Sequence, residues 1–379
     1  YVLFQLISVP LLAKLSDRHG RRSIYVLSLG LFALGSFILI TGPSAPYLLL
    51  GRAIQGFGAG GIFPVASAVI ADTFPPEKRG GALGLMGAVF GLAFLVGPPM
   101  GGVFLQFAWQ WLFLINLPIA AVLIFFAWRM LPAEGTDSEL PFDMTGAVYL
   151  TAALSCLAIG ITNLDSANIP GGFLALDVAP WLAALIVLVP LFWRAEHRAV
   201  DPIVKPQFFD SRQIRLTIVI AIGIGTVETS QVFFPKLAVM SLGVSVSTAS
   251  FLMMWSMGAM AIAAPAVGMA INKLGSKFIV QAGLVLVCIG ISIYALVPLT
   301  TFLFIAGGVI GGIGLAGLLG APLRYIMLNE VGKGDQAAVQ GLLTVFLAIG
   351  QIMGASIVGG VAASRGDGLE GYQAAFLVL

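Results

Sequence analysis

The sequence predicts an all-α protein that crosses a membrane many times, and three observations lead to this. Of the 379 residues, 59% are apolar and only 9% are charged, against about 25% charged residues in an average soluble protein. The apolar residues form long continuous runs, such as 24–40 and 112–128, which have the length of membrane-spanning helices. The runs do not alternate apolar and polar residues, as the strands of a membrane β-barrel do. Soluble enzymes, disulfide-rich scaffolds and disordered chains are excluded.

Turns and charged residues divide the apolar sequence into twelve predicted spans. Turn signals such as 41–44 and 75–80 mark the divisions. The spans are 1–14, 24–42, 46–71, 81–107, 112–131, 144–163, 178–193, 214–235, 245–271, 278–298, 302–328 and 336–363. A thirteenth apolar stretch begins near Gln373. Because the chain opens inside an apolar run without Met or a basic leader, we interpret it as a fragment that lacks N-terminal sequence.

The basic residues orient these spans in the membrane. If the connection after the first span is cytoplasmic, sixteen of the 19 Lys and Arg residues lie on the cytoplasmic side, Lys236 and Arg365 lie outside, and Arg52 lies within a span. This asymmetry is the positive-inside pattern. The sixteen cytoplasmic residues are Lys14, Arg18, Arg21, Arg22, Lys78, Arg79, Arg129, Arg194, Arg198, Lys205, Arg212, Arg215, Lys273, Lys277, Arg324 and Lys333.

The remaining composition predicts neither a metal site nor a nucleic-acid partner. The formal net charge is only +2, which is too small for a nucleic-acid-binding protein. Cys156 and Cys288 each lie inside an apolar run, which disfavours a disulfide between them and offers no metal-binding pattern.

Two of the predicted cytoplasmic connections share a spacing. The matching residues are Ala13, Asp17, Gly20 and Arg22 in the first connection and Gly268, Asn272, Gly275 and Lys277 in the second. Eight predicted spans separate the two connections, and an even number places both on the same side of the membrane, as a parallel repeat requires. Any short cytoplasmic hairpin needs Gly and a basic residue, but the match at four offsets favours a repeat.

The first connection resembles the signature loop of the major facilitator superfamily. Residues 13–22 read AKLSDRHGRR, which is similar to the family pattern G-x-L-a-D-r-x-G-r-r, with Ala13 in place of the leading Gly. Residues 52–58 (RAIQGFG) resemble the R-x-x-Q-G-x-G motif of the fourth family helix, and residues 97–102 (GPPMGG) match the G-P-x-x-G-G antiporter motif of the fifth. The resemblance implies a fold with two six-helix halves.

Two further segments resemble the fourteen-helix drug:H⁺ antiporters of that superfamily. Residues 109–118 (WQWLFLINLP) are similar to the pattern W-R-W-x-F-x-I-N-x-P, with Gln110 in place of Arg, and residues 142–146 (FDMTG) also fit. Twelve-helix members have six helices between the two signature connections, whereas eight are predicted here. Two helices are therefore interpreted as inserted, and the first family helix and most of the last are missing.

These assignments divide the chain into three parts. Residues 1–131 are expected to form the N-terminal helical half, with family helices 2–6. Residues 132–213 hold the two inserted linker helices and their flanking cytoplasmic loops. Residues 214–379 are expected to form the C-terminal half, with family helices 9–14 and the last one truncated.

The resemblance implies a cytoplasmic gating loop formed by Asp17, Gly20, Arg21 and Arg22. A carboxylate adds nothing to positive-inside anchoring, so Asp17 is expected to cap a neighbouring helix or to pair with a base when the two halves close. For the arginines, anchoring alone is the simpler explanation.

Two motifs are implied to serve proton-coupled antiport. Arg52 lies six residues into a span that begins at Pro46, so it snorkels to the interface or finds a partner, and the resemblance implies a role in proton coupling. The second motif suits a kinked helix with a smooth face that moves against another helix, and it implies antiport rather than symport. Its residues are Gly97, Pro98, Gly101 and Gly102.

Glu228 is the only carboxylate well inside a predicted span. It lies 13 residues from Arg215 at the cytoplasmic edge, about 20 Å along a helix. A charge there costs roughly 2–3 kcal/mol or more, so we expect Glu228 to face a cavity and to bind and release a proton in each cycle. The alternative is a protonated Glu228 whose interhelical hydrogen bond only holds the bundle together.

A Met-rich segment and two polar residues are candidates for the wall of the substrate cavity. Residues 251–260 are rich in Met, and Met forms adaptable apolar walls that suit varied ligands, although lipid-facing or packed residues are the simpler interpretation. The candidate cavity residues are Gln55, Asn116, Met254 and Trp255.

The resemblance implies a secondary transporter that exports lipophilic or cationic drugs and toxic compounds in exchange for protons by alternating access. We expect no cofactor beyond the proton gradient. The expected partners are a small-molecule substrate, protons and the lipid bilayer, and the expected location is a bacterial inner membrane. The protein is expected to act as a monomer, with an accessory export protein left open.

Three other function classes compete with this interpretation. A transporter of the same fold for a specific metabolite or organic ion stays open. An intramembrane enzyme is disfavoured because the sequence has no H-E-x-x-H motif, no G-x-S-x-G motif and no paired intramembrane carboxylates. An ATP-driven pump is disfavoured because no Walker loop occurs.

Overall fold

The computed structural model describes residues 1–42, 44–104, 107–132, 141–164, 172–332, 334–366 and 368–379, without the side chains of residues 94, 98, 99, 102 and 103. All regular secondary structure in these residues is helical. Eleven segments of this part of the chain are helical, long and apolar enough to cross a membrane. The prediction of an all-α polytopic membrane protein is therefore confirmed.

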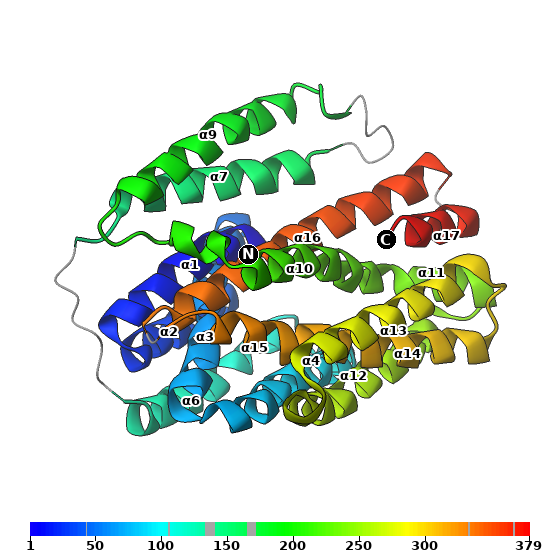
Figure 1. Cartoon of the computed structure of the whole chain (residues 1–379). Coiled ribbons are helices and arrows are strands. Elements are labelled where there is room, and N and C mark those ends of the chain that lie inside the picture. Colours follow the sequence, from blue (N-terminus) through cyan, green and yellow to red (C-terminus); the bar gives the residue numbers. More distant parts are fainter. Residues whose placement is uncertain (43, 105–106, 133–140, 165–171, 333, 367) are drawn as a thin grey trace.

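The N-terminal helices form one side of the bundle (Figure 1). They are α1 (Val2–His19), α2 (Arg21–Thr41), α3 (Ala45–Thr73), α4 (Pro76–Phe104), α5 (Trp111–Leu114) and α6 (Asn116–Met130). α1 falls outside the eleven because its 18 residues include Lys14, Asp17 and Arg18. It nevertheless packs inside the bundle, against α3 and α16.

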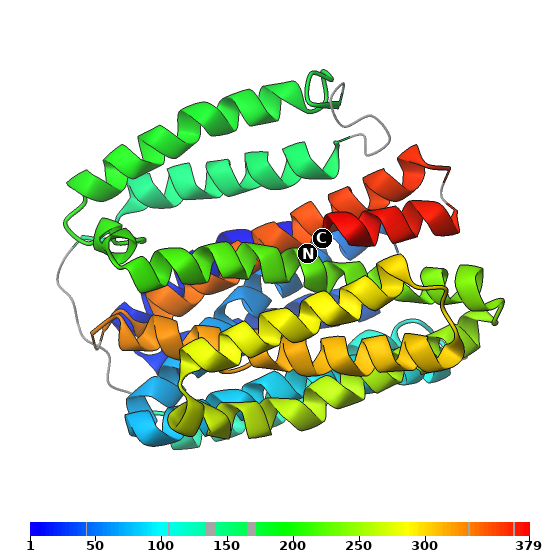
Figure 2. The same ribbon diagram turned by 45° about the vertical axis from the view of Figure 1, so that its right-hand side comes forward.

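The two helices that the sequence marked as inserted pack against each other at the edge of the bundle (Figures 1 and 2). They are α7 (Met144–Thr162) and α9 (Ala179–Arg198), and α7 also contacts α1 and α16. Residues 199–211, which we call the connector, lead from α9 to α10 and contain the short 3₁₀ helix η1 (Pro206–Asp210).

The remaining helices pack beside α1–α6 and interrupt two of the predicted spans. They are α10 (Arg212–Ser230), η2 (Gln231–Phe233), α11 (Phe234–Leu242), α12 (Val246–Leu274), α13 (Ser276–Leu296), α14 (Thr301–Leu319), α15 (Pro322–Asn329), α16 (Gln336–Ser364) and α17 (Leu369–Val378). In the span predicted over 214–235, the α-helix ends at Ser230 and the chain continues as the 3₁₀ helix η2. The span predicted over 302–328 is interrupted at Gly320, between α14 and α15. Pro322 then opens α15, where its missing N–H costs no helical bond.

The apolar core is centred on the packing of α10 against α16. Ile214, Ile218 and Ala221 recur at helical spacing on α10, and all three are buried in one cluster with Val339 and Leu343 of α16. This helix pair therefore holds the residues that follow along α10 in a fixed position.

The connections after α1, α3 and α12 lie at the same end of the bundle. Arg21, which follows the first connection, binds Asp72 at the end of α3, and Asn272 near the end of α12 binds the start of α4. We call this end the basic end, because the charge pattern places the Lys and Arg residues there.

Backbones of α4 and α12 touch along a line of glycines, which we call the glycine seam. A Cβ at Gly80 would lie 2.5 Å from the carbonyl oxygen of Gly268, and a Cβ at Gly268 would lie 2.3 Å from that of Gly80. At Gly84 an added Cβ would lie 2.7 Å from the carbonyl oxygen of Ala264. The closeness of the two helices therefore depends on residues without a side chain.

Candidate functional site

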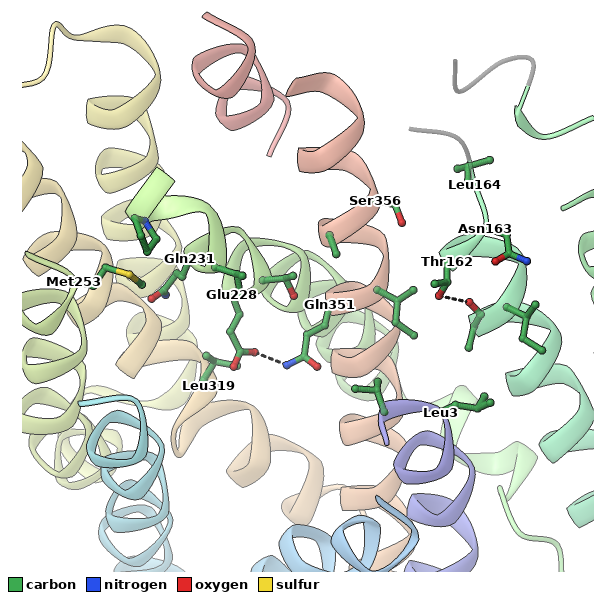
Figure 3. A pocket seen from close by; sticks show the side chains of 18 of the residues that line it. Leu3, Thr162, Asn163, Leu164, Glu228, Gln231, Met253, Leu319, Gln351 and Ser356 are labelled. Carbon is green, nitrogen blue, oxygen red and sulfur yellow. Dashed lines mark hydrogen bonds between the residues drawn. The ribbon is translucent and has the colours of Figure 1, made fainter. Parts of the chain in front are cut away.

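A cavity of about 1060 Å³ lies among α7, α10, α12 and α16, away from the basic end (Figure 3). Its wall is largely apolar, and three Met residues of α12 contribute to it. The polar groups come from α7 on one side and from α10 and α16 on the other. The lining side chains include Leu3, Thr162, Asn163, Glu228, Gln231, Met253, Met257, Met260, Leu319, Gln351 and Ser356. Such a wall suits a large, mainly apolar ligand with one or two polar groups.

Glu228 is the one charged residue among the described side chains that line this cavity. It is half-buried, and its Oε2 accepts a hydrogen bond of 2.9 Å from Gln351 Nε2 (Figure 3). Ser211 is the N-cap of α10, where its side chain accepts a hydrogen bond from the N–H of Ile214, and α10 ends two residues after Glu228. The structure thus places Glu228 in a cavity, and its role in proton transfer stays a prediction.

Arg324, which the charge pattern places on the cytoplasmic side, is a buried cation. It lies in α15 and is 3% exposed. Its Nη1 donates to Ser67 Oγ at 3.3 Å and to Gln340 Oε1 at 3.2 Å. Among the ion pairs found within 4.0 Å in the described chain, none includes Arg324.

The sequence alone contains a signal that marks Arg324 as a candidate functional residue. Arg324 is the single basic residue inside the predicted span 302–328, and Pro322 precedes it by two residues. An isolated intramembrane charge is a functional candidate by default. The positive-inside count takes Arg324 only as a marker of orientation and does not consider its burial.

Asp17 connects four helices at the basic end. It is 7% exposed, and its carboxylate accepts hydrogen bonds from the N–H groups of Ala337 at 3.2 Å and Ala338 at 2.8 Å, in the first turn of α16. It also pairs with Arg21 of α2, whose Nε binds Asp72 of α3 at 2.9 Å. A carboxylate is favoured at a helix N-terminus by the free N–H groups and the helix dipole.

The second connection of the repeat has the same backbone shape and also crosses between the two helical groups. Gly20 has φ 92° and ψ 150°, and Gly275 has φ 78° and ψ 149°. Positive φ angles favour glycine at both positions. The amide of Asn272 donates to the carbonyl oxygen of Glu77 in the first turn of α4. One connection therefore holds α16 and the other holds α4.

The neighbouring arginine of the predicted gating loop has a different environment. The guanidinium of Arg22 lies 3.9 Å from the ring centre of Trp128 in α6. This contact stays within the N-terminal helices, which fits an anchoring role better than a gating role.

Arg52 belongs to a hydrogen-bonded group that joins α2, α3 and α6. Its Nη1 donates to Gln55 Oε1 at 2.8 Å, and Gln55 Nε2 donates to Ser36 Oγ at 2.9 Å. Asn116 Nδ2 reaches the same hydroxyl at 3.3 Å. The guanidinium also lies 4.3 Å from the ring centre of Tyr1. Gln55 and Asn116 are therefore interhelical contacts outside the main cavity, contrary to the prediction.

Met254 and Trp255 are also placed outside the cavity. Trp255 is 58% exposed, as expected for a residue that faces lipid. The cavity face of α12 carries Met253, Met257 and Met260, at helical spacing. The Met residues that line this cavity are therefore neighbours of the predicted Met254 on the same helix, and whether this wall binds substrate stays a prediction.

The predicted antiporter motif makes looser contacts than expected. α4 continues as a helix through the motif to Phe104. A Cβ at Gly97 would meet nothing within 4 Å, and one at Gly101 would meet only Leu112, at 4.0 Å. The side chains at Pro98 and Gly102 lie outside the described residues. Close approach by α4 occurs instead at the glycine seam.

A family comparison covers the whole chain. The family model described as Major Facilitator Superfamily matches residues 1–227 and 216–379. The chain belongs to the major facilitator superfamily. It is accordingly a multi-pass membrane transporter and not an enzyme.

Individual superfamily members extend this result. The uncharacterised MFS-type transporter YfiU of Bacillus subtilis (strain 168) is 32% identical over 367 residues, which are 95% of this chain and 70% of the relative. The multidrug transporter protein MdtP of the same organism is 28% identical over 381 residues, 97% of this chain and 68% of the relative. The crystal structure of the human organic anion transporter MFSD10 (TETRAN) matches with a TM-score of 0.75 over 100% of this chain and 80% of that chain. At 18% identity this match shows the fold alone.

Asp17→Asn is expected to slow transport several-fold while leaving the amount of this superfamily transporter in the membrane unchanged. Asn keeps the size and one acceptor oxygen but loses the charge that binds the start of α16, a loss of about 1–2 kcal/mol. The measurement is the initial rate of substrate export per transporter. Asp72→Asn is the matched control, because Asp72 also binds Arg21 but is not hydrogen-bonded to α16. Equal rates for wild type and Asp17→Asn would contradict a charge-dependent contact.

Proposed function

We propose that this transporter exports lipophilic, predominantly cationic compounds in exchange for protons, and that it belongs to the fourteen-helix drug:H⁺ antiporter branch. The observation that carries the proposal is the position of Glu228 in the cavity. A single carboxyl group in a wide, Met-rich wall can bind a proton or neutralise a cationic ligand, and one site that accepts either ligand but not both gives exchange. Apolar adaptable walls fit ligands of varied shape.

The contacts at the basic end support alternating access. Asp17 and Asn272 each reach across to a helix of the other group, and the glycine seam brings α4 and α12 together. The cavity lies away from these contacts. Under the positive-inside orientation, this arrangement is an outward-facing state of a protein in a bacterial inner membrane. Opening these contacts would give the cytoplasm access to Glu228.

The relatives support the export of multiple compounds. MdtP carries the name multidrug transporter, and it matches nearly the whole of this chain. The alternative, transport of a specific metabolite or organic ion, would use the same cavity with Arg324 as a binding group. It is less favoured because Arg324 is bonded to Ser67 and Gln340, whereas Glu228 lines the cavity directly.

The proposal is tested with the purified protein in liposomes under an imposed pH gradient. A fluorescent lipophilic cation is expected to move against its own gradient when protons flow the other way, and a protonophore is expected to stop it. A neutral lipophilic dye and an organic anion are compared in parallel. Transport that persists without the gradient, or that is confined to the anion, would contradict proton-coupled cation export.

A further inference from the structure

Two carboxyl groups meet at the basic end, far from the transport cavity. Asp143 is the N-cap of α7, and its Oδ1 accepts from the N–H of Gly146 at 2.8 Å. Glu196 lies in the last turn of α9 and is 1% exposed. Its Oε2 accepts from the N–H of Val204 in the connector at 3.0 Å. Each carboxyl is therefore fixed through one of its two oxygens.

The other two oxygens face each other without partners. Asp143 Oδ2 and Glu196 Oε1 are buried and accept no hydrogen bond from the described residues. They are at most 4.8 Å apart, because a Cβ at Gly146 would lie 2.2 Å from Asp143 Oδ2 and 2.6 Å from Glu196 Oε1. Two buried unpaired acceptors are costly, and two carboxylates held this close repel each other. A single proton between them would remove both costs.

We propose that Asp143 and Glu196 bind one shared proton, with the O–H of one carboxyl donating to the carboxylate of the other across Gly146. A metal ion is a poorer occupant, because the described residues contain no group of three or more His, Cys, Asp or Glu side chains that could hold one. The two oxygens also leave little room above Gly146.

The basic residues near this site do not replace the proton, because each of them has another partner. Lys14 of α1 is close enough to attract the Glu196 carboxylate electrostatically, but its ammonium group is ion-paired with Asp201 of the connector. Lys205 of the connector is ion-paired with Asp335 at the start of α16. His197, the next residue on α9, has its Nδ1 2.8 Å from the carbonyl oxygen of Trp193.

The shared proton joins the inserted helices to the contacts at the basic end. Glu196 holds the connector at Val204, and the connector reaches α1 through Asp201 and α16 through Lys205. Loss of the proton as the pH rises would force the carboxyls apart and release Val204. This proton site is separate from Glu228 and does not depend on the proposed transport function.

A double-mutant cycle tests the shared proton. In Asp143→Asn or in Glu196→Gln, the amide oxygen keeps the backbone bond and the NH₂ group donates to the remaining carboxylate, as the proton does. Each single variant should therefore unfold at about the wild-type temperature at mildly acidic pH, where the wild type holds the proton, and should lose the fall in unfolding temperature that the wild type shows as the pH rises. In the double variant two NH₂ groups face each other, and the unfolding temperature should drop by about 2–5 °C.

Glu330→Gln is the matched control, because Glu330 also contacts the connector, through Ser211, but has no facing carboxyl. Combined with Asp143→Asn it should give additive shifts. Three results would overturn the proposal: additive shifts for Asp143→Asn with Glu196→Gln, single variants as unstable as the double variant, or a fall in unfolding temperature with rising pH that persists in Glu196→Gln. Poor accumulation of either single variant would also count against it, since both are isosteric.

Discussion

Replacing Glu228 by Gln is expected to reduce proton-driven export of cationic compounds at least about tenfold, with normal amounts of protein in the membrane. Gln fills the same volume and can still bond Gln351, so the packing of α10 on α16 is preserved. It cannot titrate, however, and it offers no negative charge to a cation. The measurement is the export rate across a range of pH in liposomes that contain equal amounts of each variant.

The control for this experiment is Glu330→Gln. Glu330 follows α15 at the basic end and bonds Ser211, so it tests the loss of a carboxylate away from the cavity. Its export rate and pH profile should match those of the wild type. If Glu228→Gln kept the wild-type pH profile, Glu228 would be a structural hydrogen-bonding group, as the alternative interpretation holds.

A methyl group at Gly268 is expected to reduce export at least about tenfold by holding the basic end open. Its Cβ would lie 2.3 Å from the carbonyl oxygen of Gly80 and 2.8 Å from Cα of Gly84. Such contacts force α4 and α12 apart, since overpacking of this kind costs about 1–3 kcal/mol. The outward-facing state loses this stability, whereas a state with the two helices separated does not.

The readout is the reactivity of a single cysteine at Met257, in the cavity wall, towards a reagent added from the side of the basic end. Gly268→Ala should raise this reactivity. Gly258→Ala, on the same helix, is the control: its Cβ would meet nothing within 4 Å, and Ala favours the helix over Gly. Equal reactivity and export in the two variants would show that the glycine seam does not limit closure.

The helical architecture followed from the sequence because length and apolar content decide whether a segment crosses a membrane. The predicted spans 144–163 and 336–363, for example, agree within about two residues with α7 and α16. The breaks at η2 and at Gly320 were not predictable in this way. Each of these two segments is apolar enough along its whole length to be taken for a single membrane-spanning helix, and the interruption depends on packing against other helices.

The site was predictable where one residue stood out from its surroundings. Glu228 is an isolated carboxylate in an apolar span, so its sequence alone placed it in a cavity. Gln55 and Asn116 are polar residues in similar spans, but they bond to Ser36, a partner that only the fold brings near. Met254 and Trp255 lie one and two positions after Met253, which lines the cavity together with Met257. Which of these neighbouring positions on α12 faces the cavity depends on how the helix is rotated about its axis, and the sequence does not define this rotation.

The two connections of the repeat differ in one respect that matters for how the protein opens. Asp17 holds α16 with a full charge, whereas Asn272 holds α4 with a neutral amide. On separation, Asp17 and Arg21 enter water, where dissolved ions screen them over about 8 Å at physiological ionic strength. Ionic strength therefore favours parting at α1 and α16 and leaves the contact of α4 with α12 largely unaffected. The two sides of the basic end need not open together, and the α1 side is then expected to part before the α4 side.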